Sequence, residues 1–210
     1  MINKRDIFSL SGLDLVDEIV EIYKIEKDIK VLDVGCGTGY SVNYLCEKGF
    51  DATGIDFSEE IINLGKERYK GISIKVMDAN KLDFPENYFD LILFECSLSV
   101  MQDPEKILES CKKLLKENGL ILLSDFFIKQ TNLDEDIYTL NYWNKVFSDL
   151  NFKTIIFQDK SKEWRNYLGM IIWEYGELSG LLRGNQNNKI NNYILKKETG
   201  YFLVVLKKKD

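Results

Sequence analysis

The sequence predicts an α/β fold in which helices cover both faces of a mostly parallel β-sheet. Short apolar runs alternate with stretches of helical periodicity along most of the chain, a pattern typical of parallel strands joined by right-handed crossovers. Two runs, Phe89–Phe94 and Gly119–Ser124, are apolar almost throughout, as expected of strands covered on both faces. A glycine-rich loop follows an earlier apolar run, Lys30–Val34, and such a loop commonly marks the ligand-binding edge of a parallel sheet.

Each expected strand is a short apolar run that ends in glycine, polar or charged residues. The strands are Lys30–Val34, Ala52–Ile55, Ile72–Met77, Phe89–Phe94, Gly119–Ser124, Lys153–Phe157 and Tyr201–Leu206. Helices are expected at Leu13–Tyr23, Tyr40–Lys48, Ser58–Tyr69, Pro104–Glu117 and Asp134–Leu150. Ser58 and Asp103 have side chains suited to an N-cap, and Pro104 suits the first helical position.

Composition argues against several classes of function. The formal net charge is -6 and the sequence pI is about 5.0, which disfavours nucleic acid and anionic membranes as partners. Histidine is absent, so Ser-His, Cys-His and His-metal mechanisms are excluded. The four cysteines show no C-x-x-C spacing, so no metal site is expected. Neither a signal peptide nor a membrane span is expected, which predicts a cytoplasmic location.

The strongest motif is VLDVGCGTG at residues 31–39. Glycines at three alternate positions, Gly35, Gly37 and Gly39, allow a sharp turn and a close approach of the backbone to a ligand. The helix that follows offers free N–H groups to an anionic group. Tyr40 occupies the position where a dinucleotide fingerprint has its third glycine, which disfavours a nicotinamide cofactor.

Three later strand ends carry residues suited to the same ligand. Asp56 lies roughly 20 residues beyond the loop, where a carboxylate can accept hydrogen bonds from ribose hydroxyls; alternatively, it caps the helix that follows. Phe57 can pack on an adenine face. Asp78 and Ala79 follow the third strand and can bond the adenine edge, while Glu95 follows the fourth. Because carboxyl ends of parallel strands share one edge, these groups are expected to converge.

Taken together, these segments resemble the class I S-adenosylmethionine-dependent methyltransferases. The resemblance rests on VLDVGCGTG, GIDFS, MDAN, FDLILFE and LLKENGLILLSDF in that order, and on the terminal GYFLVVLKKK. The resemblance covers residues 28 to 127 best. Several of these segments are similar in sequence to a bacterial subgroup of the small-molecule branch of that family. It implies a Rossmann-like, seven-stranded sheet whose last strand is antiparallel. It also implies S-adenosyl-L-methionine as the cofactor.

The resemblance also assigns roles to particular residues. Asp33 and the Gly35–Gly39 loop, which includes Cys36, would hold the methionine end of the cofactor, with Glu95 also contacting it. Tyr40, directly after the loop, is a further expected cofactor-binding residue. Asp56 and Phe57 would serve the ribose and adenine, and Asp78 with Ala79 the adenine. The Asn/Asp-Pro-Pro-Tyr run of many enzymes that methylate amide or amino groups is replaced by Glu95-Cys96-Ser97-Leu98. A small-molecule acceptor is therefore expected rather than a DNA base or a protein glutamine.

Methyl transfer from a sulfonium can proceed without a general base. If a base is needed, the candidates are Glu95, Asp125 or a tyrosine. Cys96 is either a small apolar residue or a thiol that binds a soft acceptor. Two alternative functions stay open: a non-catalytic protein that binds S-adenosylmethionine or S-adenosylhomocysteine, and a nicotinamide-dependent oxidoreductase.

The 210 residues suit one domain. We expect an N-terminal helical segment at 1–27, a cofactor-binding core at 28–160, a small helical cap insertion at 161–199, and a final strand and tail at 200–210. Trp164 and the apolar residues after it indicate either a helix packed on the domain or a lid over the acceptor. A monomer or a homodimer is expected.

Overall fold

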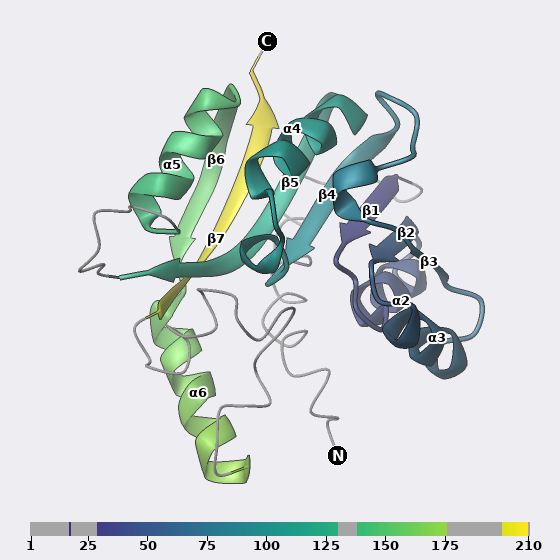
Figure 1. Ribbon diagram of the computed structural model, residues 1–210, viewed down its shortest axis with the longest axis horizontal. Helices are drawn as coiled ribbons and strands as arrows, with labels where there is room; N and C mark the ends of the chain where they lie inside the picture. Colours follow the sequence, from purple (N-terminus) through teal and green to yellow (C-terminus); the bar gives the residue numbers. More distant parts are fainter. Residues whose placement is uncertain (1–16, 18–28, 130–137, 176–198, 210) are drawn as a thin grey trace.

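The computed structural model describes residues 17, 29–129, 138–175 and 199–209, which form a seven-stranded sheet with helices on both faces (Figure 1). The strand order is β3-β2-β1-β4-β5-β7-β6. Neighbouring strands from β3 to β5 pair in parallel, whereas β7 lies antiparallel between β5 and β6. The predicted sheet, with its last strand inserted antiparallel, is confirmed.

The observed elements follow the predicted order. The strands are β1 (Lys30–Val34), β2 (Asp51–Asp56), β3 (Ser73–Val76), β4 (Phe89–Glu95), β5 (Leu115–Ile128), β6 (Phe152–Asp159) and β7 (Thr199–Lys208). The helices are α2 (Tyr40–Glu47), α3 (Glu59–Arg68), α4 (Pro104–Leu114), α5 (Leu140–Asp149) and α6 (Ser161–Tyr175). Two 3₁₀ turns, η2 (Ala79–Lys81) and η3 (Leu98–Val100), follow β3 and β4.

Two apolar layers hold the helices against the sheet. On one face, buried residues of α4 and α5, among them Ile107 and Trp143, pack against β4, β5 and β7. On the other face, α2 and α3 contribute Val42, Leu45 and Ile62. Each fully buried apolar side chain of this size contributes about 1.5–3 kcal/mol. The central strands are therefore covered on both sides, as the apolar runs predict.

The prediction that the fourth helix extends to Glu117 is wrong. Helix α4 ends at Leu114, and β5 begins at Leu115. Leu115 is fully buried and pairs with Phe89, and the Tyr88 N–H donates to the Leu114 carbonyl at 2.8 Å. Pairing with β4 thus takes these residues out of the helix.

Helix α4 begins where the sequence predicts, at Pro104, whereas the start of α5 differs from the prediction. Asp103 occupies the N-cap position of α4 with Pro104 after it, but its side chain makes no capping hydrogen bond. The helix expected to begin at Asp134 begins at Leu140, where the Thr139 hydroxyl accepts from the Tyr142 N–H. A side-chain cap inside the expected helix therefore fixes its observed start.

Some expectations fall outside the described residues. Apart from Asp17, the expected Leu13–Tyr23 helix lies there, as do residues 134–137 and residues 176–198 of the expected cap insertion. Of that insertion, α6 is described, and β7 already begins at Thr199. The division of the chain at 27, 160 and 199 stays a prediction. None of the helices described is long and apolar enough to cross a membrane.

Candidate functional site

The candidate site lies at the carboxyl ends of β1, β2 and β4. Strand β1 has β2 on one side and β4 on the other, and the helices that follow β1 and β4 cover opposite faces of the sheet. The order of the strands reverses between β1 and β4, and ligands of open α/β sheets bind at such a reversal. The glycine loop after β1 therefore begins at the expected edge.

Each of the three loop positions requires glycine for a different local reason. A Cβ on Gly35 would lie 2.6 Å from the Ser97 Cβ, and a Cβ on Gly39 would lie 2.8 Å from the Ile72 Cδ1. A Cβ on Gly37 would meet nothing within 4 Å, although its φ of 56° favours glycine. Gly37 is thus the point of the loop where the backbone is left open to a ligand.

Asp56 joins the end of β2 to this loop. One carboxylate oxygen, Oδ2, accepts from the Gly37 N–H at 3.1 Å, and Oδ1 accepts from the Ser58 N–H at 2.9 Å. Ser58 is the N-cap of α3, since its hydroxyl accepts from the Ile61 N–H. The alternative in which Asp56 itself caps this helix is therefore wrong. Phe57 follows Asp56 with its side chain 73% exposed, as required of a ring that packs on a ligand.

Asp78 lies beside Asp56 because the Met77 N–H donates to the Asp56 carbonyl. The Asp78 carboxylate accepts from the Asn80 N–H at 2.9 Å and from the Asn80 side-chain amide at 3.2 Å. These two bonds lower the pKa of Asp78. Ala79 begins η2 and is half-buried. Sequence reasoning missed Asn80, whose Oδ1 is buried with no hydrogen-bond partner in the described part of the chain.

Glu95 and Asp33 lie on the side of the sheet that α2 covers. The Ser41 hydroxyl, in the first turn of α2, donates to Glu95 Oε2. Asp33 is 2% exposed and pairs in register with Leu93 on β4. Glu95 lies two residues further along the same strand. Sequence reasoning missed Ser41, because a serine inside a helix carries no ligand-binding signal of its own.

Cys36 and Tyr40 have side chains turned to the protein. A Cβ on Gly54 would lie 2.7 Å from the Cys36 sulfur, so the thiol packs on β2. Burial raises the pKa of Cys36, which keeps the thiol protonated. The Tyr40 ring lies 6.4 Å from the Tyr69 ring, edge to face. With its thiol packed on β2, Cys36 can offer a ligand its backbone only.

Asp125 is fully buried at the carboxyl end of β5. Its Oδ2 accepts from the Ser99 N–H at 2.8 Å, and its Oδ1 accepts from the Ser99 hydroxyl at 2.5 Å and the Phe126 N–H at 2.7 Å. Burial raises the pKa of Asp125 to about 6, although these hydrogen bonds oppose the shift. Sequence reasoning named Asp125 but missed Ser99.

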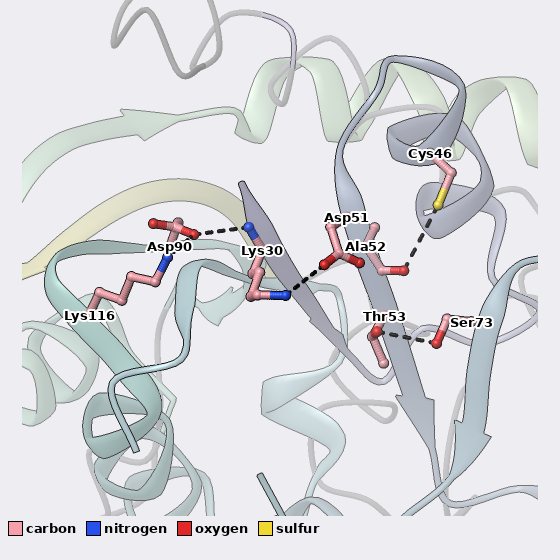
Figure 2. Close-up of polar contacts among 8 residues, drawn as sticks. All are labelled: Lys30, Cys46, Asp51, Ala52, Thr53, Ser73, Asp90 and Lys116. Atoms are coloured by element: carbon pink, nitrogen blue, oxygen red, sulfur yellow. Dashed lines mark hydrogen bonds and ion pairs between the residues drawn. The ribbon is translucent and has the colours of Figure 1, made fainter. Parts of the chain in front are cut away.

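The opposite end of the strands carries contacts between the strands themselves (Figure 2). The Lys30 ammonium pairs with Asp51 at 2.8 Å, and the Lys30 N–H donates to Asp90, which also pairs with Lys116. Further along β2, the Thr53 hydroxyl donates to the Ser73 hydroxyl of β3 at 3.2 Å. These partly exposed pairs order neighbouring strands and are worth at most about 1 kcal/mol each. Asp51 and Asp56 thus stand at opposite ends of one strand with different surroundings.

The residues at the carboxyl edge fit the predicted cofactor. An open backbone position at Gly37, a carboxylate at Asp56 and an exposed ring at Phe57 come together at this edge, because the Gly37 N–H donates to Asp56 and Phe57 follows Asp56. S-adenosylmethionine is an adenosine joined to a charged amino acid. Binding it requires an aromatic face for the adenine, an acceptor for the ribose hydroxyls and backbone polar groups for the amino-acid part. Among the described residues, no group of three His, Cys, Asp or Glu side chains could hold a metal ion.

A comparison with protein families gives a match over most of the chain. The family described as "Methyltransferase domain" matches residues 25–194. The chain belongs to this methyltransferase family. The match includes the glycine loop, Asp56, Asp78, Glu95 and Asp125.

Curated relatives carry names of the same class. Phosphoethanolamine N-methyltransferase of Plasmodium falciparum (isolate 3D7) is 29% identical over 178 residues, which are 76% of this chain and 67% of that protein. Phosphoethanolamine N-methyltransferase 1 of Arabidopsis thaliana is 30% identical over 179 residues, 76% of this chain but 36% of that protein. The chain therefore spans only about a third of the length of this plant relative.

Solved structures agree in fold. Phosphoethanolamine N-methyltransferase 2 of Haemonchus contortus, in complex with phosphomonomethylethanolamine and S-adenosylhomocysteine, has a TM-score of 0.74 at 16% identity over 100% of this chain and 61% of that chain. The [4+2]-cyclase SpnF also has a TM-score of 0.74, at 20% identity over 93% of this chain and 80% of that chain. The predicted family and its cofactor are confirmed: the chain is a methyltransferase of the S-adenosylmethionine-dependent class.

Proposed function

We propose that this methyltransferase transfers a methyl group from S-adenosylmethionine to a small-molecule acceptor, at the carboxyl ends of β1, β2 and β4. The observation that carries the proposal is the open Gly37 backbone, joined by a 3.1 Å hydrogen bond to Asp56 at the end of β2. The relatives and the net charge of -6 support a small acceptor over nucleic acid.

The cofactor is held in this proposal by three groups of residues. Asp33, the Gly35–Gly39 loop with Cys36, Tyr40 and Glu95 hold its methionine end. Asp56 accepts from the ribose hydroxyls, and Phe57 packs on the adenine. Asp78 and Ala79 bond the adenine edge. The 3.1 Å hydrogen bond from the Gly37 N–H to Asp56 and the exposed Phe57 ring support this arrangement.

The cofactor supplies an activated methyl group, and the protein supplies orientation and exclusion of water. Glu95 and Asp125 are the proposed groups for accepting a proton, if the acceptor must lose one. Glu95 is half-buried at the end of β4, whereas Asp125 is fully buried and already bonded by Ser99. We therefore assign proton acceptance to Glu95 first. A cytoplasmic location and a monomer or homodimer complete the proposal.

The proposal is tested by release of S-adenosylhomocysteine from S-adenosylmethionine with a panel of small acceptors. The panel includes phosphoethanolamine and demethylmenaquinone, the compounds in the names of curated relatives. Asp56→Ala is expected to lower the rate at limiting cofactor by tenfold or more, about the value of a hydrogen bond to a charged group. Asp51→Ala, at the other end of β2, is the matched control and should retain the wild-type rate.

A second function is favoured by one specific comparison. A solved chain of this fold is titled a [4+2]-cyclase rather than a methyltransferase, so the fold can serve other chemistry. The alternative is a protein that binds S-adenosylmethionine or S-adenosylhomocysteine without transferring the methyl group. Tight binding of both compounds with no product from any acceptor supports it, whereas turnover with one acceptor excludes it.

A further inference from the structure

A left-handed residue stands directly after Glu95. Cys96 has a φ of 49° and its side chain is 1% exposed. This conformation costs a non-glycine residue about 1–2 kcal/mol. Such residues persist where the surrounding contacts over-determine them, and they cluster at functional sites. Contacts with neighbouring segments must therefore hold Cys96 in this conformation.

The turn after β4 is attached to three neighbouring strands. The Cys96 N–H donates to the Ser124 carbonyl of β5 at 2.8 Å. The Ser97 hydroxyl donates to the Val34 carbonyl, at the end of β1, at 2.7 Å. The Cys96 thiol lies 3.4 Å from the Tyr201 hydroxyl of β7. The turn is thus fixed at Cys96 and Ser97 by its neighbours.

Asp125 fixes Ser99, two residues after Ser97. Its two carboxylate oxygens accept from the backbone N–H and the hydroxyl of Ser99, in η3, and both residues are 0% exposed. A buried carboxylate is costly unless its oxygens are hydrogen-bonded. The bonds between Asp125 and Ser99 therefore specify where η3 lies, which in turn limits the path of the chain from Glu95 to Leu98.

We propose that Asp125 is a positioning residue of the methyl-transfer site: by binding Ser99 it holds the left-handed turn at Cys96 and thereby orients Glu95 toward the cofactor's methionine end. This inference rests on the proposed function. Asp125 acts through Ser99, because its side chain is fully buried and its two oxygens accept three hydrogen bonds from the protein. In the proposed function Asp125 thereby has a role distinct from that of Glu95, the other candidate carboxylate.

Loss of the bond between Asp125 and Ser99 is expected to weaken the binding of one ligand and leave the binding of another nearly unchanged. S-adenosylhomocysteine has an amino-acid end, and 5′-methylthioadenosine has the same adenosine without it. In Ser99→Ala and Asp125→Asn, the Kd for S-adenosylhomocysteine is expected to rise about tenfold while that for 5′-methylthioadenosine changes less than about twofold. Ser124→Ala is the matched control. It removes a buried hydroxyl from the strand that carries Asp125, and this hydroxyl has no hydrogen-bond partner among the described residues.

A second measurement reports on the turn itself. Cys96 and Cys111 are both buried free cysteines, one in the turn and one on the buried side of α4. Alkylation followed by mass spectrometry is expected to label Cys96 faster in Ser99→Ala and Asp125→Asn than in wild type, with Cys111 unchanged. Equal acceleration at both cysteines would mean general destabilisation and would overturn the inference.

The outcomes separate this inference from the proposed function. If wild type binds S-adenosylhomocysteine but the variants weaken both ligands equally, or neither, the positioning role fails and the proposed function stands. If wild type binds neither ligand, the proposed function fails and the positioning role fails with it. The ligand split together with selective labelling of Cys96 supports the role of Asp125.

Discussion

The carboxylate of Asp56 accepts a 3.1 Å hydrogen bond from the backbone N–H of Gly37, so the end of β2 is joined to the glycine loop that follows β1. Two segments that are separate in sequence thereby form one edge. The same carboxylate also bonds the Ser58 N–H, which leaves its orientation fixed before any ligand binds. A preorganised acceptor of this kind lowers the cost of ligand binding.

Gly37→Ala tests whether the open face of the loop receives a ligand. Its φ of 56° predicts a loss of about 1 kcal/mol in the free energy of unfolding. Gly71→Ala is the matched control, since Gly71 has a φ of 84° and also meets nothing within 4 Å. Both variants should lose similar stability in urea, but only Gly37→Ala should weaken S-adenosylhomocysteine binding in calorimetry. Equal affinities in the two variants would contradict a ligand at Gly37.

Gly35→Ala should cost more stability than Gly37→Ala. A methyl group at Gly35 would lie 2.6 Å from the Ser97 Cβ, and its φ is 82°, so strain and a steric clash add. We expect a loss of about 2–4 kcal/mol, from the strain of the turn and from overpacking. Urea unfolding of the two variants side by side measures the difference. If Gly35→Ala loses less free energy of unfolding than Gly37→Ala, the turn at Ser97 can shift to accommodate the added methyl group, and the predicted clash is absent.

Asp125 predicts a pH dependence of stability. Burial raises its pKa from 3.8 to about 6 in the folded protein. The protonated Asp125 carboxyl therefore adds to the free energy of unfolding. This added stability is fully present below the unfolded pKa of 3.8 and is lost as the pH rises through about 6. Between about pH 4 and pH 7, the free energy of unfolding of wild type relative to Asp125→Asn should fall by roughly 2 kcal/mol. Urea titrations of both proteins across this range measure the difference, and a constant difference would contradict the assignment.

Phe57→Ala should separate ligand binding from stability. The ring is 73% exposed, so its removal should change the free energy of unfolding by less than about 0.5 kcal/mol. Affinity for 5′-methylthioadenosine should fall about threefold to tenfold, because stacking on an aromatic face is worth about 1 kcal/mol. Phe157→Ala on edge strand β6, where the ring is 41% exposed, is the control and should leave ligand affinity unchanged. Unchanged affinity in Phe57→Ala would remove this ring from the site.

The sheet and the glycine loop were predictable because their signals are local. An apolar run followed by Gly35, Gly37 and Gly39 indicates a strand and a tight turn without knowledge of the rest of the chain. The boundary between α4 and β5 was not predictable in this way. Leu115 suits a helix or a strand, and the pairing with Phe89 that decides between them comes from a distant segment.

The residues around the edge were predictable only in part. Carboxylates at strand ends, such as Asp56 and Glu95, stand out in the sequence. Ser41 and Ser99 do not, because their roles come from contacts with Glu95 and Asp125, 54 and 26 residues away. The left-handed Cys96 was also beyond sequence reasoning, since no turn-forming glycine marks the position.

Calorimetric titration with S-adenosylmethionine, S-adenosylhomocysteine and NAD tests the central claim most directly, on wild type, Asp56→Ala and Asp51→Ala. The account predicts micromolar binding of the two sulfur compounds to wild type and Asp51→Ala, weakened by tenfold or more in Asp56→Ala, with no binding of NAD. Preference for NAD, or equal binding of S-adenosylmethionine to all three proteins, would contradict the assignment of this cofactor to the edge formed by Gly37 and Asp56.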